Sequence, residues 1–198
     1  MKIFVFGDSF STKFSDGSFI PTGKEYIKWK GYEPKIYPEL LSEHFDANLI
    51  NKSFGGTDNE TIFFKFIDEF SNIGKDDLVI FGWSNVTRFS FVERGMWISS
   101  TCRPDVNFVK EMLVNRDHKL YKDRQFQLIE FLDKVLPSQK VIHWKWSHIV
   151  THSIGEETNM EVKDNHYNEY GHQMVAKKMI EGLQINDKVR IDVDNLRH

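Results

Sequence analysis

Short, mostly apolar runs with strand propensity alternate along the chain with longer segments of helical character. These runs occupy residues 2–6, 48–51, 77–81 and 140–144. The first is mostly apolar without a break, as in a strand that is buried on both faces. Strands that alternate with helices predict a parallel sheet covered by helices on both faces, with right-handed crossovers. The order of these segments therefore places the chain in the α/β class.

The connections between the runs contain the expected helices and loops. Amphipathic or helix-prone segments predict helices at residues 38–45, 58–70, 105–136 and 168–183, the third broken near residues 115–118. Residues 11–32, 86–104 and 147–163 lack a regular period, and we expect loops there, the first two over the mouth of a site. The tail, residues 186–198, alternates apolar and polar positions, so it either adds a strand or frays.

The size and composition of the chain suit one domain, residues 1–198, with one core. Its 198 residues are 40% hydrophobic, which is enough for a single sizeable core. The 26 Lys and Arg residues against 29 Asp and Glu give a net charge of −3, which does not favour general binding to nucleic acid. The one cysteine, Cys102, excludes an internal disulfide, and we expect it to pack as a small apolar side chain.

The N-terminus enters the first predicted strand directly, without a charged leader followed by an apolar stretch. No apolar run in the sequence is long enough to span a bilayer. We therefore expect a soluble protein that is made in the cytosol and has no membrane partner. It could act elsewhere as part of a larger particle or after release by lysis.

The first predicted strand is closed by the tripeptide Gly7-Asp8-Ser9. Glycine tolerates a sharp turn there, and Asp and Ser side chains can satisfy local backbone groups. A serine at the carboxyl end of a parallel strand lies where open α/β sheets place their chemistry. Two interpretations follow from this tripeptide alone: a nucleophile at Ser9, or an ordinary turn in which Asp8 or Ser9 caps a helix.

A second polar segment, residues 164–172, leads into the last predicted helix and contains His166. A histidine just before a helix can reach across the end of the sheet toward Ser9, and Asp164 lies two residues before it. Such a pair suits a general base and the group that orients it. The alternative is a helix-entry turn in which Asp164 and His166 serve as caps.

Residues 7–10, Gly-Asp-Ser-Phe, resemble the first sequence block of the SGNH (GDSL-type) hydrolases. Residues 164–172 resemble the last block of the same family. The resemblance spans roughly residues 1–180. It implies a flavodoxin-like three-layer αβα sandwich with a central parallel sheet, in which Ser9 is the nucleophile, His166 the base and Asp164 its orienter. The family usually places its Asp three residues before its His, whereas the interval here is two.

The resemblance also implies an oxyanion hole and a substrate pocket. The backbone N–H of Ser9 supplies one donor, and Gly56, like the glycine of the family's second block, supplies another. The family's third block reads Gly-x-Asn-Asp, whereas this chain has Gly-Trp-Ser-Asn at residues 82–85. Either Ser84, at the matching position, or Asn85, one residue late, is the third donor. Three further residues are candidates for substrate binding: Asp8, Trp83 and Arg88, the last as an anion clamp.

Together these features predict a serine hydrolase that cleaves a carboxylic ester and needs no cofactor. The family, and aromatic residues that can stack on sugar rings, suggest an O-acetyl group on a carbohydrate as the substrate. The aromatic residues are Tyr26, Trp29, Trp83 and Trp97. The alternative is a non-catalytic module of the same fold that binds a ligand or forms part of a larger assembly, its activity lost through the altered blocks.

Two other classes of site are disfavoured by the sequence. His148 and His152 lie four residues apart, as zinc ligands on a helix do, but no Glu follows the first and no third ligand is evident, so we predict no metal site. A nucleotide-binding flavodoxin-like protein would need a glycine-rich phosphate loop after the first strand, and the chain has none there.

Overall fold

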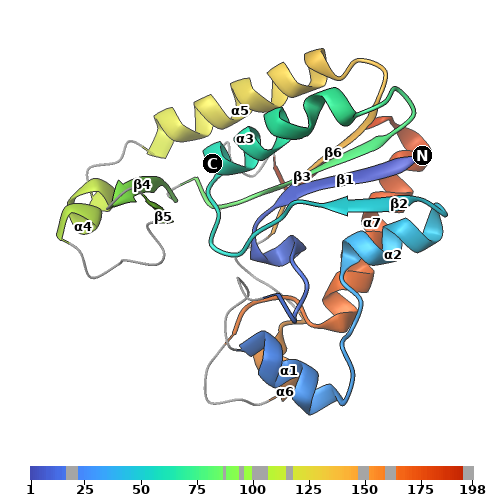
Figure 1. Ribbon diagram of the computed structural model, residues 1–198, viewed down its shortest axis with the longest axis horizontal. Coiled ribbons are helices and arrows are strands. Elements are labelled where there is room, and N and C mark those ends of the chain that lie inside the picture. Colours follow the sequence, from blue (N-terminus) through green and yellow to red (C-terminus); the bar gives the residue numbers. More distant parts are fainter. Residues whose placement is uncertain are drawn as a thin grey trace.

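A five-stranded parallel sheet forms the centre of the protein (Figure 1). The computed structural model describes residues 1–16, 22–86, 88–93, 96–99, 107–114, 118–146, 152–158 and 164–193. The strands are β1 (Lys2–Gly7), β2 (Asn48–Asn51), β3 (Leu78–Trp83), β6 (Lys140–Lys145) and β7 (Lys188–Ile191). Their spatial order, β2-β1-β3-β6-β7, is the flavodoxin-like order, with the topological switch point between β1 and β3.

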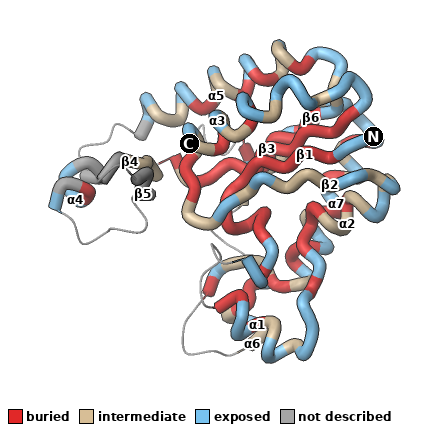
Figure 2. Tube along the Cα trace, in the orientation of Figure 1, coloured by how far each residue is buried: buried red, intermediate tan, exposed pale blue. Residues whose placement is uncertain are grey.

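Helices cover both faces of this sheet and complete the three layers (Figure 1). One face packs against α2 (Tyr37–His44) and α7 (Glu169–Ile185), the other against α3 (Asn59–Glu69) and α5 (His118–Val135). Successive strand residues point to opposite faces, so Ile3 joins the first core and Phe4 the second. The central strands are buried almost throughout (Figure 2), which explains their mostly apolar runs. The α/β class and the αβα layers predicted from the sequence are confirmed.

Three predicted loops contain regular structure instead. The first holds helix α1 (Thr22–Lys30), and the last holds the short helix α6 (Ile154–Thr158). The middle one holds strands β4 (Ser90–Glu93) and β5 (Met96–Ser99), which pair antiparallel as a second, two-stranded sheet. The first and last of these loop predictions were wrong because α1 and α6 are stabilised by contacts distant in sequence: Tyr26 of α1 is fully buried and bonds to Glu157 of α6.

The remaining elements agree with the sequence pattern. The helical segment at residues 105–136 is divided into α4 (Asn107–Val114) and α5, and residues 115–117 between them lie outside the described part. Short 3₁₀ turns occur at η1 (Ser9–Ser11) and η2 (Phe70–Asn72). The tail adds a strand, since β7 pairs in parallel with β6. Within the described ranges, no helix is both long and apolar enough to cross a membrane.

Candidate active site

Ser9 lies at the carboxyl edge of the sheet, immediately beyond the end of β1. Strand β1 ends at Gly7, and Asp8 adopts an extended conformation that caps the η1 turn. The carboxylate of Asp8 accepts a hydrogen bond of 3.1 Å from the backbone N–H of Phe10. Ser9 is the first residue of this turn, so the cap fixes its backbone beside the switch point, where α/β proteins commonly bind ligands.

Two glycines allow the η1 turn to pack closely against the sheet. Gly7 of β1 and Gly82 of β3 are register partners. A Cβ atom at Gly7 would lie 2.4 Å from Ser11 Oγ, and one at Gly82 would lie 2.6 Å from the same atom. Ser11 occupies this space and forms a 2.8 Å hydrogen bond with the Tyr37 hydroxyl, which also accepts one of 3.0 Å from Trp144 Nε1. This buried polar network anchors the turn that carries Ser9.

His166 is held by a clamp of backbone hydrogen bonds between residues 152–155 and the segment before α7. The N–H of Ile154 donates to the carbonyl of His166 at 2.9 Å, and the N–H of Gly155 donates to that of Asp164 at 3.0 Å. Asn168 then caps α7 by accepting from a first-turn N–H at 2.9 Å. The helix therefore begins at a fixed point, and the residues before it have a defined conformation.

This conformation brings Ser9, His166 and Asp164 into one hydrogen-bonded chain. Ser9 Oγ lies 2.7 Å from His166 Nε2, and His166 Nδ1 lies 2.6 Å from Asp164 Oδ1. The backbone N–H of His166 also donates to Asp164 Oδ1, at 2.8 Å. Because that oxygen accepts both N–H groups, an interval of two residues is sufficient for Asp164 to reach the ring.

The electrostatics of this chain favour an ionised Asp164. Burial disfavours the charged carboxylate, but the hydrogen bonds from His166 and the charge of its ring outweigh it and lower the pKa of Asp164 to about 2. A carboxylate facing Nδ1 directs the ring N–H to that side and leaves Nε2 able to accept the Ser9 proton. Ser9 is only 4% exposed, so the reactive atoms are recessed.

Aromatic rings flank the histidine on the side of the nucleophile turn. The ring of Phe10 lies 4.7 Å from that of His166, and Trp146 stacks on Phe10 at 4.6 Å. Trp146 Nε1 in turn donates to Asp8 Oδ2 at 3.3 Å. The sequence analysis missed Trp146, although its place just after β6 puts it at the same edge of the sheet as Ser9.

Asp8 and Ser84 lie beneath the site rather than open to a ligand. Arg88 Nη1 donates to Ser84 Oγ at 2.9 Å and lies 3.3 Å from Asp8 Oδ2. Asp8 is 1% exposed and Ser84 0%. Burial raises the pKa of Asp8, against the opposing effect of Arg88. Both side chains contact Arg88, and the assignments of Asp8 to substrate binding and of Ser84 to the oxyanion hole stay predictions.

Trp83 is a core residue, which corrects its assignment to substrate binding. Its ring stacks on Phe81 at 5.3 Å, and its Nε1 donates to His143 Nδ1 at 3.2 Å. It is fully buried, as is Tyr26. Strand β3 extends through Gly82 to Trp83, two residues beyond the predicted end, and this extension turns the Trp83 side chain into the core on the α3 side of the sheet.

Gly56 and Asn85 follow β2 and β3 at the edge where Ser9 lies. Gly56 has a φ of 75°, in the left-handed region that glycine adopts without strain. Asn85 is partly exposed, and its carbonyl accepts from the N–H of Arg88 at 3.0 Å. The preceding residue, Ser84, is fixed by Asn59, which accepts from its N–H at 2.7 Å and donates to its carbonyl at 3.2 Å.

The part of the chain that the structure describes contains no group of three or more His, Cys, Asp and Glu side chains able to hold a metal ion. Of the two histidines with zinc-like spacing, His148 lies outside the described residues. His152 is exposed and stacks edge-on against Tyr170 at 4.6 Å.

Comparison with solved structures finds a distant similarity to a known protein. No family model matches the sequence, and no curated protein matches it. A solved structure of a "putative GDSL-like lipase" from Parabacteroides merdae is similar over 99% of this chain and 90% of its own, with 8% identity and a TM-score of 0.34. A similarity at this level does not identify a function, so the proposal below rests on the geometry of the site.

Proposed function

We propose that this protein is a serine hydrolase of the SGNH type that cleaves a carboxylic ester. The observation that supports the proposal is the hydrogen-bonded chain from Ser9 Oγ through both ring nitrogens of His166 to Asp164, with distances of 2.7 and 2.6 Å. The three residues come from opposite ends of the sequence, yet they meet at the carboxyl edge of the sheet. This is the arrangement of a nucleophile, a base and the carboxylate that orients it.

In the proposed reaction Ser9 Oγ attacks the ester carbonyl carbon while His166 Nε2 takes the hydroxyl proton. The tetrahedral intermediate then collapses, and His166 returns the proton to the departing oxygen, which leaves as the alcohol. A water molecule, deprotonated by the same Nε2, attacks the acyl group on Ser9. The carboxylic acid departs, and the proton held by His166 restores the Ser9 hydroxyl.

The oxyanion that forms in both steps requires hydrogen-bond donors aimed at it. We assign this role to the backbone N–H groups of Ser9 and Gly56 and to the side chain of Asn85. Buried Ser84 is left out of this group. Arg88, held by Ser84 and Asp8 and still 20% exposed, adds positive charge near the reacting carbonyl.

The proposal stops at the ester class and does not extend to a sugar ester. Of the four aromatic residues expected to stack on sugar rings, Tyr26 and Trp83 are buried, and the side chain of Trp97 lies outside the described part. Trp29 is 50% exposed but stacks on Tyr26. A non-catalytic binding module remains the alternative, and the hydrogen-bonded Ser9–His166 pair favours the enzyme, since a ligand-binding module has no need of it.

Labelling with a fluorophosphonate probe, together with hydrolysis of 4-nitrophenyl acetate, tests this function. We expect the wild type to react in both assays and Ser9→Ala in neither. Ser15→Ala is the matched control, because Ser15 is an exposed serine of the same N-terminal segment, and it should behave like the wild type. Labelling of Ser9→Ala at the wild-type rate would exclude Ser9 as the nucleophile. A wild type inert in both assays would favour the binding module.

A further inference from the structure

The ring of the candidate base belongs to a stack of three rings: His166, Phe10 and Trp146. The Phe10 ring lies 4.7 Å from the His166 ring, and the Trp146 ring lies 4.6 Å from the Phe10 ring at an interplanar angle of 13°. The three residues come from different segments, namely the entry of α7, the η1 turn and the residue after β6. Because His166 must direct Nε2 at Ser9, a ring packed against it limits the orientations that it can adopt.

One buried carboxylate, to which the proposed reaction gives no part, is bonded to two members of this stack. Asp8 Oδ1 accepts from the backbone N–H of Phe10 at 3.1 Å, and Asp8 Oδ2 accepts from Trp146 Nε1 at 3.3 Å. Asp8 is 1% exposed, and a hydrogen bond away from water is electrostatically stronger than one in water. Asp8 therefore fixes Phe10 through its backbone and Trp146 through its indole.

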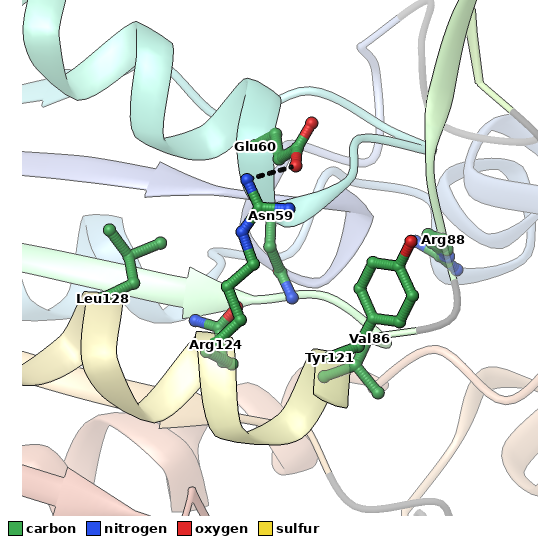
Figure 3. A pocket seen from close by; sticks show the side chains of 8 residues that line it. Asn59, Glu60, Val86, Arg88, Tyr121, Arg124 and Leu128 are labelled. Carbon is green, nitrogen blue, oxygen red and sulfur yellow. Dashed lines mark ion pairs between the residues drawn. The ribbon is translucent and has the colours of Figure 1, made fainter. Parts of the chain in front are cut away.

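A third contact of Asp8 leads to another part of the molecule. Arg88 Nη1 lies 3.3 Å from Asp8 Oδ2 and 2.9 Å from Ser84 Oγ. The Arg88 side chain also lines a small cleft whose other walls come mainly from α3 and α5 (Figure 3). Asp8 thus reaches the His166 ring through Phe10 and Trp146, and an experiment must separate this route from the contact with Arg88.

We propose that Asp8 is a positioning residue for His166 and that it acts through the stacked rings of Phe10 and Trp146. The carboxylate holds these two residues in place, and Phe10 keeps the His166 ring aligned with Nε2 2.7 Å from Ser9 Oγ. This inference rests on the proposed hydrolase function. It gives Asp8 a role other than the substrate binding expected from the sequence, and the two roles predict different kinetics.

Asp8→Asn tests this role, because it keeps the size of the side chain but turns N–H groups toward donors that need an acceptor. We expect kcat for 4-nitrophenyl acetate to fall about 10- to 10²-fold, as for a small displacement of a catalytic group, with KM unchanged. Asp16→Asn is the matched control, since Asp16 is an exposed acid of the same N-terminal segment, and it should keep the wild-type kinetics. A raised KM or an unchanged kcat in Asp8→Asn would overturn the proposal.

Substitutions of Trp146 separate the ring stack from Arg88. Trp146→Phe removes the indole N–H but leaves a ring on Phe10, and Trp146→Leu removes the ring as well, so we expect the Leu variant to lose more kcat. The double variant Asp8→Asn/Trp146→Phe should lose at least about 2-fold less than the product of the two single losses, because the two residues share one bond. Losses that simply multiply, or a wild-type kcat in Trp146→Leu, would refute the proposed route.

A spectroscopic measurement tests the positioning apart from catalysis. The ring current of Phe10 should shift the Hε1 and Hδ2 resonances of His166, which are assigned by their loss in His166→Ala. At one fixed pH, these resonances should move toward unfolded-chain values in Asp8→Asn and Trp146→Leu and stay unchanged in Asp16→Asn.

Unmoved resonances in the two stack variants would overturn the proposal. If Asp8→Asn does not fold, Trp146→Leu alone decides. A wild type without esterase activity would refute the hydrolase, and the His166 resonances would then decide the positioning role.

Discussion

The stability of the protein should fall in mild acid because His172 is buried in the neutral form. This residue of α7 is 2% exposed, and its Nδ1 accepts a hydrogen bond of 3.3 Å from the backbone N–H of Tyr37. Phe14 packs edge-on against its ring at 5.5 Å. Burial, with a smaller contribution from the charge of His166, lowers the pKa of His172 from 6.5 to about 3.

The sign and size of the effect follow from proton linkage. Between pH 6.5 and about 3 the unfolded chain holds a proton on His172 that the folded protein does not, so stability falls as the pH falls. Each pH unit in this window costs about 1.4 kcal/mol. On lowering the pH from 6.5 to 5.0, His172 should therefore remove about 2 kcal/mol from the free energy of unfolding.

The perturbation that isolates this contribution is His172→Asn. An Asn side chain keeps an acceptor near the position of Nδ1 but does not titrate, so any cost of the smaller side chain is the same at every pH. Urea unfolding of both proteins at pH 7.5, 6.0 and 5.0 gives the difference in free energy of unfolding. We expect the difference to move about 2 kcal/mol in favour of the variant at the lowest pH. If the free energy of unfolding fell by the same amount with pH in the wild type and in the variant, the assignment of a buried neutral His172 would be refuted.

Three further substitutions test the site and its surroundings. Trp83→Phe should lower the free energy of unfolding by about 1–3 kcal/mol, because buried His143 loses its donor, and should leave KM unchanged; a raised KM would return Trp83 to the substrate pocket. Asp164→Asn should reduce kcat by about 10²–10⁴ with little change in the thermal midpoint, and a wild-type kcat would show that the ring needs no orienter. Asn85→Ala should reduce kcat about 10²–10³ at constant KM, and unchanged turnover would remove Asn85 from the oxyanion hole.

The sheet and its polar edge were predictable from the sequence because both depend on local pattern. The mostly apolar run at residues 2–6 indicates a strand buried on both faces, and all of it but Lys2 is buried; Asp8 and Ser9 then form the turn at the carboxyl end of β1. The same reasoning placed His166 at a helix entry, which is where Asn168 caps α7. What the sequence left uncertain was whether Asp164 could reach His166 across two residues, which depends on backbone geometry.

The errors occur where tertiary contacts outweigh local signals. The third strand is predicted to end at residue 81, yet Gly82 lies within it, where its missing side chain makes room for Ser11 and for Trp144. Helix α1 has no clear apolar stripe because Tyr26 is its one large, fully buried side chain. Its partner, α6, lies far along the chain, so no local pattern indicates the pairing.

The clamp on His166 belongs to a part of the molecule with its own small core. Residues 152–155 hold His166 and Asp164 by backbone hydrogen bonds, and α6, which begins there, packs against α1 rather than against the large sheet (Figure 1). Four side chains form the buried cluster beneath them: Phe14, Tyr26, Ile36 and Ile154.

A cluster of four buried side chains can open at a lower free energy than the cores on either face of the sheet. Lys30 of α1 forms ion pairs of 2.8 Å to Glu157 of α6 and 3.0 Å to Glu169 of α7. If α1 and α6 separated, His166 and Asp164 would lose their fixed positions while the sheet and Ser9 stayed in place. Turnover should then be lost at a lower temperature or denaturant concentration than the spectroscopic signal of folding. The difference between the midpoint of inactivation and the midpoint of unfolding measures how independently of the sheet α1 and α6 unfold.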